Sequence, residues 1–393
     1  MGESLQKVLI LGGGFAGVKA ALELSDSHKF EVTLLSDQAN FRYYPSLFHA
    51  ATGGKMAASS IPLVEIFDDK LVKIVKDSAK TLDRNKKLVK GTRGKTYNYD
   101  ILIVALGVVT NYFGVKGLEK YSYSIKTQQD AQELREHIHK QLIDEQKPDV
   151  NYVVIGGGPT GVELAGALPA YINHVIKSHN LAPAKLHIDL VEAAHRLMPR
   201  MPRSYSVAIQ KHLRKLGIKL YLGQSVQGET AEGLMVNGYP IESHTVIWTA
   251  GVTNHPFLEA NGFVMNEHGK AVVDEQLKSE HDIYVIGDNA DTPYSGMAQT
   301  ALYDAVFVAK NLKRLSAGQK TNAYTPKKPV YVTPAGPRWA AVIWGKVHLY
   351  GWVGWALRSA ADLAGYHDFG PWWQASRLWL DENEREKNCP VCS

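Results

Sequence analysis

The chain has 393 residues, enough for two or three domains with cores of their own. Hydrophobic residues make up 45% of it and charged residues 21%, the composition of an ordinary globular protein. The net charge of +5 is too small and too scattered to indicate nucleic-acid binding, although it would suit an anionic lipid surface.

The first predicted elements form a β-α-β unit. Val8–Leu11 is a continuous apolar run that ends at a glycine, as in a buried parallel strand. Ala16–Ser25 has the pattern of a helix, and Phe30–Leu35 that of a second strand, which ends at Ser36 and Asp37. No signal peptide precedes the first strand, which favours an intracellular protein.

A second β-α-β unit repeats this arrangement at Asn151–Ile155, Gly161–Leu168 and Leu186–Glu192. Apolar strands that begin at Tyr99, Thr245 and Asp282 also end at small residues and glycine. The pattern predicts an α/β protein with two Rossmann-like dinucleotide-binding domains, the second inserted in the first. We expect the first domain at residues 1–113 and 253–325, the second at 114–252, and an aromatic-rich C-terminal extension at 326–393.

Each unit carries a glycine fingerprint between its strand and its helix. These are Gly12-x-Gly14-x-x-Gly17 and Gly156-x-Gly158-x-x-Gly161. In each, the first glycine allows a tight turn, the second lets the backbone approach a pyrophosphate, and the third lets helix and strand pack closely. The helix N-terminus adds free N–H groups for the phosphates. Two fingerprints predict two dinucleotides, and the economical pair is a permanently bound flavin and an exchangeable nicotinamide.

An acidic residue at the end of the second strand of each unit is expected to bind a ribose. In the second unit this residue is Glu192, whose carboxylate would repel a 2′-phosphate and so favours NADH over NADPH. Arg196 lies nearby and could weaken that preference, and a solvated strand end is the alternative explanation of Glu192. In the first unit either Ser36 or Asp37 could reach the ribose.

Three further motifs resemble the flavoprotein reductases with two dinucleotide-binding domains. They are ALG at Ala105–Gly107, WTAGV at Trp248–Val252 and IGDNA at Ile286–Ala290. The resemblance covers roughly residues 5–315 and implies FAD, with Asp288 binding its ribityl chain; a plain turn aspartate is the alternative.

Within that group the chain resembles the type II, non-proton-pumping NADH:quinone oxidoreductases. GGGPTGVELAGAL matches their second fingerprint, including Glu163, and GMAQTALYDA is similar to their Ala-Gln-x-Ala-x-Gln stretch at the flavin edge. Ala298, Gln299 and Ala301 match that stretch, but Tyr303 replaces the second glutamine. This substitution leaves two points open: how the protein contacts the quinone, and whether that quinone is menaquinone or ubiquinone.

The resemblance implies hydride transfer from the nicotinamide of NADH to the flavin, followed by electron transfer to a quinone. Glu163 and Gln299 are the candidate catalytic residues, although a first-turn helix carboxylate and a solvent-facing glutamine are their plain alternatives. Gln299 and Tyr303 would contact the quinone. The residues expected to hold FAD are Gly12, Gly14, Phe15, Ala16, Gly17, Ser36, Asp37, Ala105, Gly107, Gly287, Asp288, Ala298 and Gln299. Those expected to hold NADH are Gly156, Gly158, Pro159, Thr160, Gly161, Glu163, Glu192 and Gly251.

The C-terminal extension holds seven of the eight tryptophans, between Trp339 and Trp379. Its apolar run Val347–Leu357 is too short to span a bilayer. KVHLYGWVGWALRSAADLAGY predicts a helix in the plane of the membrane surface, with Lys346 and Arg358 at lipid phosphates. We therefore expect a peripheral protein on the cytoplasmic face of the cell membrane. The alternative is that these aromatic residues pack against the body or the partner subunit of a homodimer.

The two cysteines, Cys389 and Cys392, end the chain as CPVC. This pair could be half of a zinc site, a redox-active tail, or a terminus without a catalytic role, which we favour; we therefore expect no metal. Residues 1–388 contain no cysteine, so the flavin would pass electrons to a diffusible acceptor and not to a neighbouring thiol pair. The rival hypotheses are a soluble NADH-dependent ferredoxin or rubredoxin reductase and a slow, NADH-sensing flavoprotein.

Overall fold

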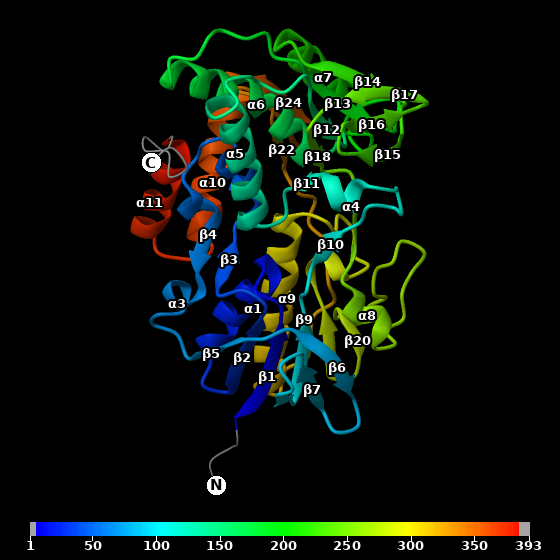
Figure 1. Cartoon of the computed structure of the whole chain (residues 1–393). Coiled ribbons are helices and arrows are strands. Elements are labelled where there is room, and N and C mark those ends of the chain that lie inside the picture. The colour runs from blue at the N-terminus through cyan, green and yellow to red at the C-terminus, as the bar shows by residue number, and fades with distance from the viewer. Residues whose placement is uncertain (1–4, 385–393) are drawn as a thin grey trace.

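Two parallel sheets organise the computed structural model, which describes residues 5–384. The first sheet lies at the bottom of Figure 1 and the second at the top. In the first sheet only the edge strand β20 runs antiparallel. Its order is β20 (Lys278–Glu280), β21 (Ile283–Val285), β9 (Ile101–Val104), β1 (Gln6–Leu11), β2 (Phe30–Ser36) and β5 (Val72–Lys76).

From residue 8 to its end at residue 11, the central strand β1 is apolar because it is buried on both faces. Val8 and Ile10 face the packed helices α1 (Phe15–Ser25) and α9 (Ala298–Ser316). Leu9 and Leu11 face the other way, into a core shared with a small antiparallel sheet. The strands of that sheet are β6 (Ala79–Asp83), β7 (Leu88–Gly91) and β8 (Thr96–Asn98). Side chains that alternate between two cores explain why the sequence shows a continuous apolar run.

The second sheet is entirely parallel and is covered in the same way. Its order is β11 (Tyr123–Ser124), β18 (Thr245–Trp248), β12 (Tyr152–Ile155), β13 (Ile188–Glu192) and β14 (Lys219–Leu222). On one face lie α5 (Gln128–Ile143), α6 (Pro159–Ser178) and α7 (Arg203–Lys215). On the other lies a sheet of β15 (Val226–Thr230), β16 (Gly233–Val236) and β17 (Tyr239–Glu242).

The second domain is inserted in the first. Strand β21 pairs with β9 in the first sheet, although every strand of the second sheet lies between them in the sequence. An antiparallel ribbon of β10 (Val108–Thr110) and β19 (Val252–Asn254) joins the two sheets. The α/β fold with an inserted Rossmann-like domain is thus confirmed, and the residue limits of the domains stay a prediction.

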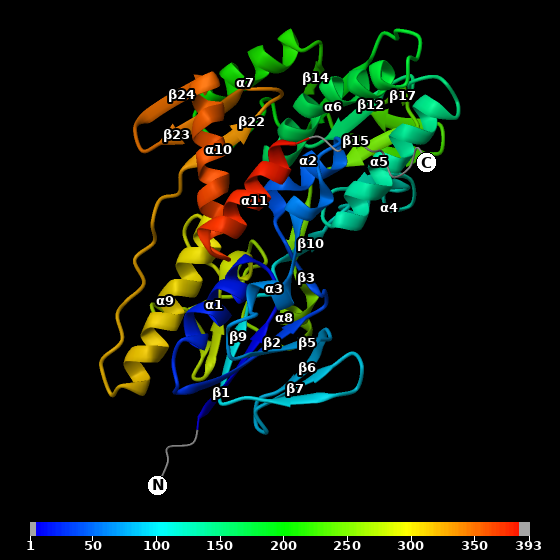
Figure 2. The same ribbon diagram turned by 90° about the vertical axis from the view of Figure 1, so that its left-hand side faces the viewer.

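The C-terminal region forms a hairpin sheet and two helices. The strands are β22 (Tyr331–Pro334), β23 (Ala340–Trp344) and β24 (Val347–Gly351), and the helices are α10 (Trp352–His367) and α11 (Trp372–Asn383). Helices α10 and α11 pack side by side, shown in orange and red in Figure 2. The predicted helix from Lys346 is wrong in its first part, because residues up to Gly351 continue the hairpin and the left-handed φ of 79° at Gly351 ends it.

Helix α10 buries an unusual set of residues. Gly354, Arg358, Asp362 and Tyr366 recur every four residues and face the protein. Arg358 is only 9% exposed, so the expectation that it meets lipid phosphates is wrong. Within the C-terminal region, the most exposed aromatic side chains are instead Trp344 (59%), Trp352 (65%), Trp372 (55%) and Trp373 (69%).

Over residues 5–384, none of the helices has the length and apolar character needed to pass through a bilayer. The remaining elements are short. They are β3 (Asn40–Arg42), η1 (Tyr44–Ser46), α2 (Leu47–Ala51), η2 (Met56–Ser59), β4 (Ser60–Pro62), α3 (Leu63–Ile66), α4 (Leu118–Tyr121), α8 (Pro256–Ala260) and η3 (Gly287–Asn289).

Candidate active site

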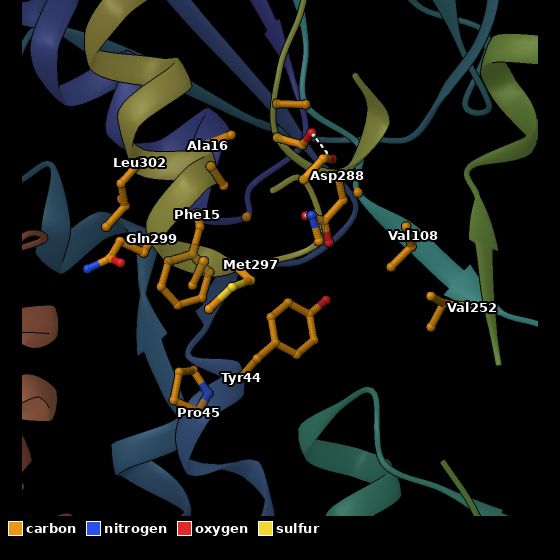
Figure 3. A pocket seen from close by; sticks show the side chains of 18 of the residues that line it. Phe15, Ala16, Tyr44, Pro45, Val108, Val252, Asp288, Met297, Gln299 and Leu302 are labelled. Atoms are coloured by element: carbon orange, nitrogen blue, oxygen red, sulfur yellow. Dashed lines mark hydrogen bonds between the residues drawn. The ribbon is translucent and has the colours of Figure 1, made fainter. Parts of the chain in front are cut away.

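A cavity of about 1840 Å³ lies where the carboxyl ends of the strands in both sheets meet the C-terminal helices. Its wall includes both fingerprint turns, the loops after β9 and β18, helix α9 and one side of α10. Figure 3 shows part of it, with Phe15, Asp288 and Gln299 around the opening. Pockets for one small ligand usually hold about 300–1,000 Å³, so this volume suits two dinucleotides.

The fingerprint glycines divide into two structural classes. A Cβ atom on Gly17 would lie 1.9 Å from the carbonyl oxygen of Gly12, and one on Gly161 would lie 1.8 Å from that of Gly156. These glycines permit close contact between helix and turn, and they do not line the cavity. By contrast, a Cβ on Gly14 or Gly158 would meet nothing within 4 Å.

Gly14 and Gly158 both line the cavity and precede the first turns of α1 and α6. In the described chain no side chain caps either helix N-terminus. Free N–H groups beside an open space form a cradle for a phosphate. The residues therefore fit two pyrophosphates, one at each turn.

The turn that carries Asp288 is built by its neighbours. Asp288 lines the cavity, its Oδ1 accepts a hydrogen bond from the Gly296 N–H at 3.1 Å, and burial raises its pKa. Lys270 Nζ contacts the Asp288 carbonyl oxygen at 3.3 Å and Ser295 Oγ at 2.6 Å. Lys270 also lines the cavity, and sequence reasoning missed it.

Asn289 is a second missed residue. It is fully buried, and its side chain accepts from the Gly107 N–H at 2.8 Å and donates to the Gly107 carbonyl at 2.6 Å. It therefore joins the loop after β9 to the turn after β21. The IGDNA motif contained the signal, because a buried Asn beside a cofactor aspartate can bind both groups of a peptide unit.

The carboxylate of Glu192 lies at the second fingerprint turn. Its Oε2 accepts from the Gly157 N–H at 2.6 Å and its Oε1 from the Ala194 N–H at 2.7 Å. Glu192 lines the cavity. The guanidinium of Arg196 instead donates to the Met201 carbonyl at 2.7 Å and does not line the cavity, so nothing here lets it weaken a preference for NADH.

Ser36 and Asp37 both line the cavity at the first turn. Ser36 is almost fully buried, whereas Asp37 forms an ion pair with Arg42 at 3.2 Å. Both therefore remain candidates for the ribose. Gly251, expected beside the nicotinamide, does not line the cavity. It packs against a neighbouring segment instead, since a Cβ atom added to it would lie 2.4 Å from the carbonyl oxygen of Asn111.

Gln299 and Tyr303 lie on the cavity side of α9. The Gln299 Oε1 accepts from the Val330 N–H at 2.9 Å, which leaves its amide N–H groups as donors. The ring of Tyr303 carries the Lys327 ammonium 5.1 Å from its centroid. Phe15 forms an apolar wall nearby, with Phe369 at 5.4 Å between ring centroids.

Buried charges close the cavity at α10. Arg358 Nη1 lies 3.5 Å from Glu163 Oε1, and its Nε lies 2.6 Å from Asp362 Oδ2. Burial raises the pKa of Glu163 to about 7, and Arg358 opposes that effect. Glu163 thus holds or releases a proton near neutral pH. Sequence analysis identified Glu163, wrongly assigned Arg358 to lipid phosphates and missed Asp362.

Most of the remaining predicted residues also line the cavity: Gly12, Ala16, Ala105, Gly107, Gly156, Pro159, Thr160, Gly287 and Ala298. Their binding roles stay predictions. Cys389 and Cys392 lie outside the described residues.

Comparisons with known proteins agree with this architecture. The chain is 29% identical to the type II NADH:quinone oxidoreductase of Staphylococcus saprophyticus over 348 residues, 82% of this chain and 86% of that protein. This similarity confirms the resemblance to type II NADH:quinone oxidoreductases.

Two solved structures show the fold. NDH2 from Plasmodium falciparum in complex with NADH has a TM-score of 0.86 at 17% identity and covers 97% of this chain and 98% of its own. A ferredoxin reductase from Rhodopseudomonas palustris has a TM-score of 0.72 at 22% identity and covers 86% of this chain and 81% of its own. A profile of the pyridine nucleotide-disulphide oxidoreductases matches residues 6–305. The chain belongs to the pyridine nucleotide-disulphide oxidoreductase family.

Proposed function

We propose that this protein is an FAD-dependent NADH:quinone oxidoreductase that works at a membrane surface without pumping protons. One observation carries the proposal: a single cavity connects both phosphate cradles with α9 and the inner side of α10. The exposed tryptophans lie on β23, α10 and α11 of the same C-terminal region. A nicotinamide, a flavin and a lipid-soluble acceptor can therefore meet in one enclosed space.

The first cradle would hold FAD. The Gly14 turn and the N-terminus of α1 suit its pyrophosphate, Asp288 would bind the ribityl chain, and the backbone at Gly107 would lie against the ring. The second cradle, at Gly158, would hold NADH. Glu192 would accept hydrogen bonds from the adenosine ribose and repel the 2′-phosphate of NADPH.

Bound FAD supplies the chemistry that accepts a hydride and passes on two electrons. The protein supplies orientation and protons. Reduction of a quinone to a quinol consumes two protons, of which NADH brings only one. Glu163 lines the cavity and has a pKa of about 7, so it can give a proton to a quinone oxygen at neutral pH. The free N–H groups of Gln299 can donate to the other carbonyl.

The identity of the acceptor also rests on the C-terminal region. Tryptophan prefers the lipid headgroup zone, and four tryptophans of this region are more than half exposed. We propose that they place the cavity mouth at the cytoplasmic face of the cell membrane. A soluble ferredoxin or rubredoxin reductase is the second candidate, supported by the fold shared with a ferredoxin reductase over 86% of this chain. A homodimer is compatible with either function.

An anaerobic half-reaction experiment tests the proposal. The holoenzyme is bleached with one equivalent of NADH and then mixed with a ubiquinone or menaquinone analogue, or with oxidised ferredoxin. We expect rapid reoxidation by a quinone only. Bleaching followed by reoxidation with ferredoxin alone would replace the proposal with the second candidate, and a persistent charge-transfer complex would indicate an NADH sensor.

Membrane contact has its own test. Replacing Trp372 and Trp373 with serine should reduce binding to anionic vesicles and turnover with a long-chain quinone, while turnover with a short-chain analogue stays unchanged. The matched control is Tyr239→Ser, because Tyr239 is 75% exposed but lies on β17, outside the C-terminal region. Equal vesicle binding by the tryptophan variant and wild type would contradict a membrane role.

A further inference from the structure

A buried cluster of four charged residues lies between three helices behind the cavity. Helix α6 contributes Glu163, α10 contributes Arg358 and Asp362, and α11 contributes Glu382. The first three side chains are only 11–12% exposed, and Glu382 is 6% exposed. Glu163, Arg358 and Asp362 line the cavity, whereas Glu382 does not.

The hydrogen bonds of the guanidinium leave Glu382 without a cation of its own. Arg358 pairs with Asp362 through Nε at 2.6 Å, with the Pro45 carbonyl through Nη2 at 2.9 Å and with Glu163 through Nη1 at 3.5 Å. Within residues 5–384, the Oε2 of Glu382 is buried and has no hydrogen-bond partner. A buried carboxylate oxygen in that position is costly if the group is ionised.

The charge balance of the cluster requires bound protons. Three ionised carboxylates around one guanidinium would leave two negative charges in a poorly solvated site, so the neutral form of at least one carboxyl group is favoured. Asp362 holds the close ion pair with Arg358, which leaves Glu163 and Glu382 as the proton-holding members. Burial and the nearby Asp362 carboxylate raise the pKa of Glu382 to about 8, against the opposing effects of Arg358 and of a hydrogen bond with Tyr366.

The other titratable groups that face Glu382 do not supply a compensating charge. They are Tyr366 on α10 and Tyr43 before η1, whose rings stack at 4.2 Å. On the outer side of α11, Asp381 and Glu384 both bind Lys55, at 2.7 and 2.8 Å. The cluster therefore has one end at the cavity, at Glu163, and the other on α11, at Glu382, next in sequence to Asp381, which binds Lys55.

We propose that Glu382 is a second proton-holding carboxyl group, coupled to Glu163 through Asp362 and Arg358, and that this cluster takes up from the medium the proton consumed in quinone reduction. The inference rests on the proposed function. The hydride of NADH brings two electrons and one proton. The second proton leaves the Glu163 carboxyl as the quinol O–H forms, and uptake from the medium restores the proton count of the cluster. Glu382 does not touch the substrate, so it is a positioning residue.

Two measurements on the holoenzyme test this inference, with E382Q as the variant and E384Q as the matched control. Glu384 lies near the same end of α11 and undergoes the same chemical change, but its side chain is 47% exposed. The first measurement is the infrared signal of protonated carboxyl groups as a function of pH. Wild type and E384Q should show a signal lost near pH 8, and this signal should be smaller in E382Q, where Glu229, whose pKa burial also raises to about 8, accounts for the rest.

The second measurement is the pH profile of flavin reoxidation by a quinone analogue. Glu382 is still protonated at the Glu163 midpoint near pH 7, so that midpoint should not move in E382Q. The second fall in rate near pH 8, which should add about tenfold per pH unit in wild type and E384Q, should be absent from E382Q. Bleaching by NADH should not change. An E382Q variant with the infrared signal of wild type and the same second fall in rate near pH 8 would overturn the inference.

If E382Q does not fold, E163Q replaces it in the infrared measurement. Burial also raises the pKa of Glu229 to about 8, so E163Q is combined with E229Q. A protonated carboxyl signal that persists near pH 7 in E163Q/E229Q supports Glu382 as the second group, and its complete loss overturns the inference. Failure of the proposed function looks different. Wild-type flavin would then not be reoxidised by quinones, while the infrared titration would still report the protons of the cluster.

Discussion

Four glycine-to-alanine variants separate the residues needed for the fold from those needed for the cofactors. In G17A and G161A the new methyl group would lie 1.9 and 1.8 Å from a backbone carbonyl oxygen, well inside the 3.0 Å that real Cβ atoms respect. The helix must then move by about 1 Å from its strand, at or above the usual overpacking cost of about 1–3 kcal/mol.

In G14A and G158A the methyl group meets nothing within 4 Å. The φ angles of −92° and −77° are open to alanine, so these variants should be as stable as wild type or up to about 1 kcal/mol more stable. The space that each methyl fills is the space predicted for a pyrophosphate. G14A should lower the affinity for FAD at least about tenfold. G158A should bind NADH about tenfold more weakly, with its FAD content unchanged. A tenfold loss of affinity corresponds to about 1.4 kcal/mol of binding free energy.

Urea unfolding, flavin absorbance per polypeptide and NADH titration of the four purified proteins measure these effects. Stable G14A protein with a full flavin content, or G158A with wild-type NADH affinity, would show that the open spaces do not hold the pyrophosphates. Unfolding of G14A and G158A to the same degree as G17A and G161A would refute the division into two classes.

Three further predictions concern the buried polar residues. R358M should lower the free energy of unfolding by about 3–5 kcal/mol because it leaves Asp362 as an unpaired buried charge, and a loss below 1 kcal/mol in urea titration would contradict this. The pKa of Glu382 rises on folding from 4.5 to about 8, so the folded state binds a proton that the unfolded state releases in this pH range. The stability that this proton contributes at low pH is lost as the pH rises from 4.5 to about 8. The difference in Tm between pH 5 and pH 9 should therefore be smaller in E382Q than in wild type. N289A removes both side-chain hydrogen bonds to Gly107 and should lower the free energy of unfolding by about 1–3 kcal/mol. The variant should also lose flavin on gel filtration. Unchanged flavin retention would exclude a role of Asn289 in shaping the site.

The parts of the fold that the sequence predicted are those with local signals. Apolar runs ending at glycine placed the strands of both β-α-β units, because a strand buried on both faces has few polar residues. The fingerprints located both cradles because tight turns and close helix–strand packing require glycine at fixed spacing. Gly251 shows the limit of that argument, since its packing partner is a neighbouring segment and not the cavity.

The parts that were missed depend on contacts between distant segments. Arg358 and Asp362 lie on a mostly apolar helix, and only the contact between α6 and α10 shows that the charges face inward. The spacing of Arg358 and Asp362 by four residues was the available signal. The hydrogen bond from Val330 to Gln299 and the start of α10 at Trp352 likewise follow from the hairpin sheet, which no local pattern indicated.

The cavity wall formed by α10 and the preceding hairpin sheet limits how the protein can be shortened. The family profile ends at residue 305, yet Thr333, Arg358 and Gly365 line the same cavity as the glycine turns. A truncation after α9 would open one wall of the reaction chamber to bulk water and leave Glu163 without its guanidinium partner. The C-terminal region is thus an integral part of the catalytic body, and exchanging it between relatives would transplant one wall of the cavity together with the surface that bears the exposed tryptophans.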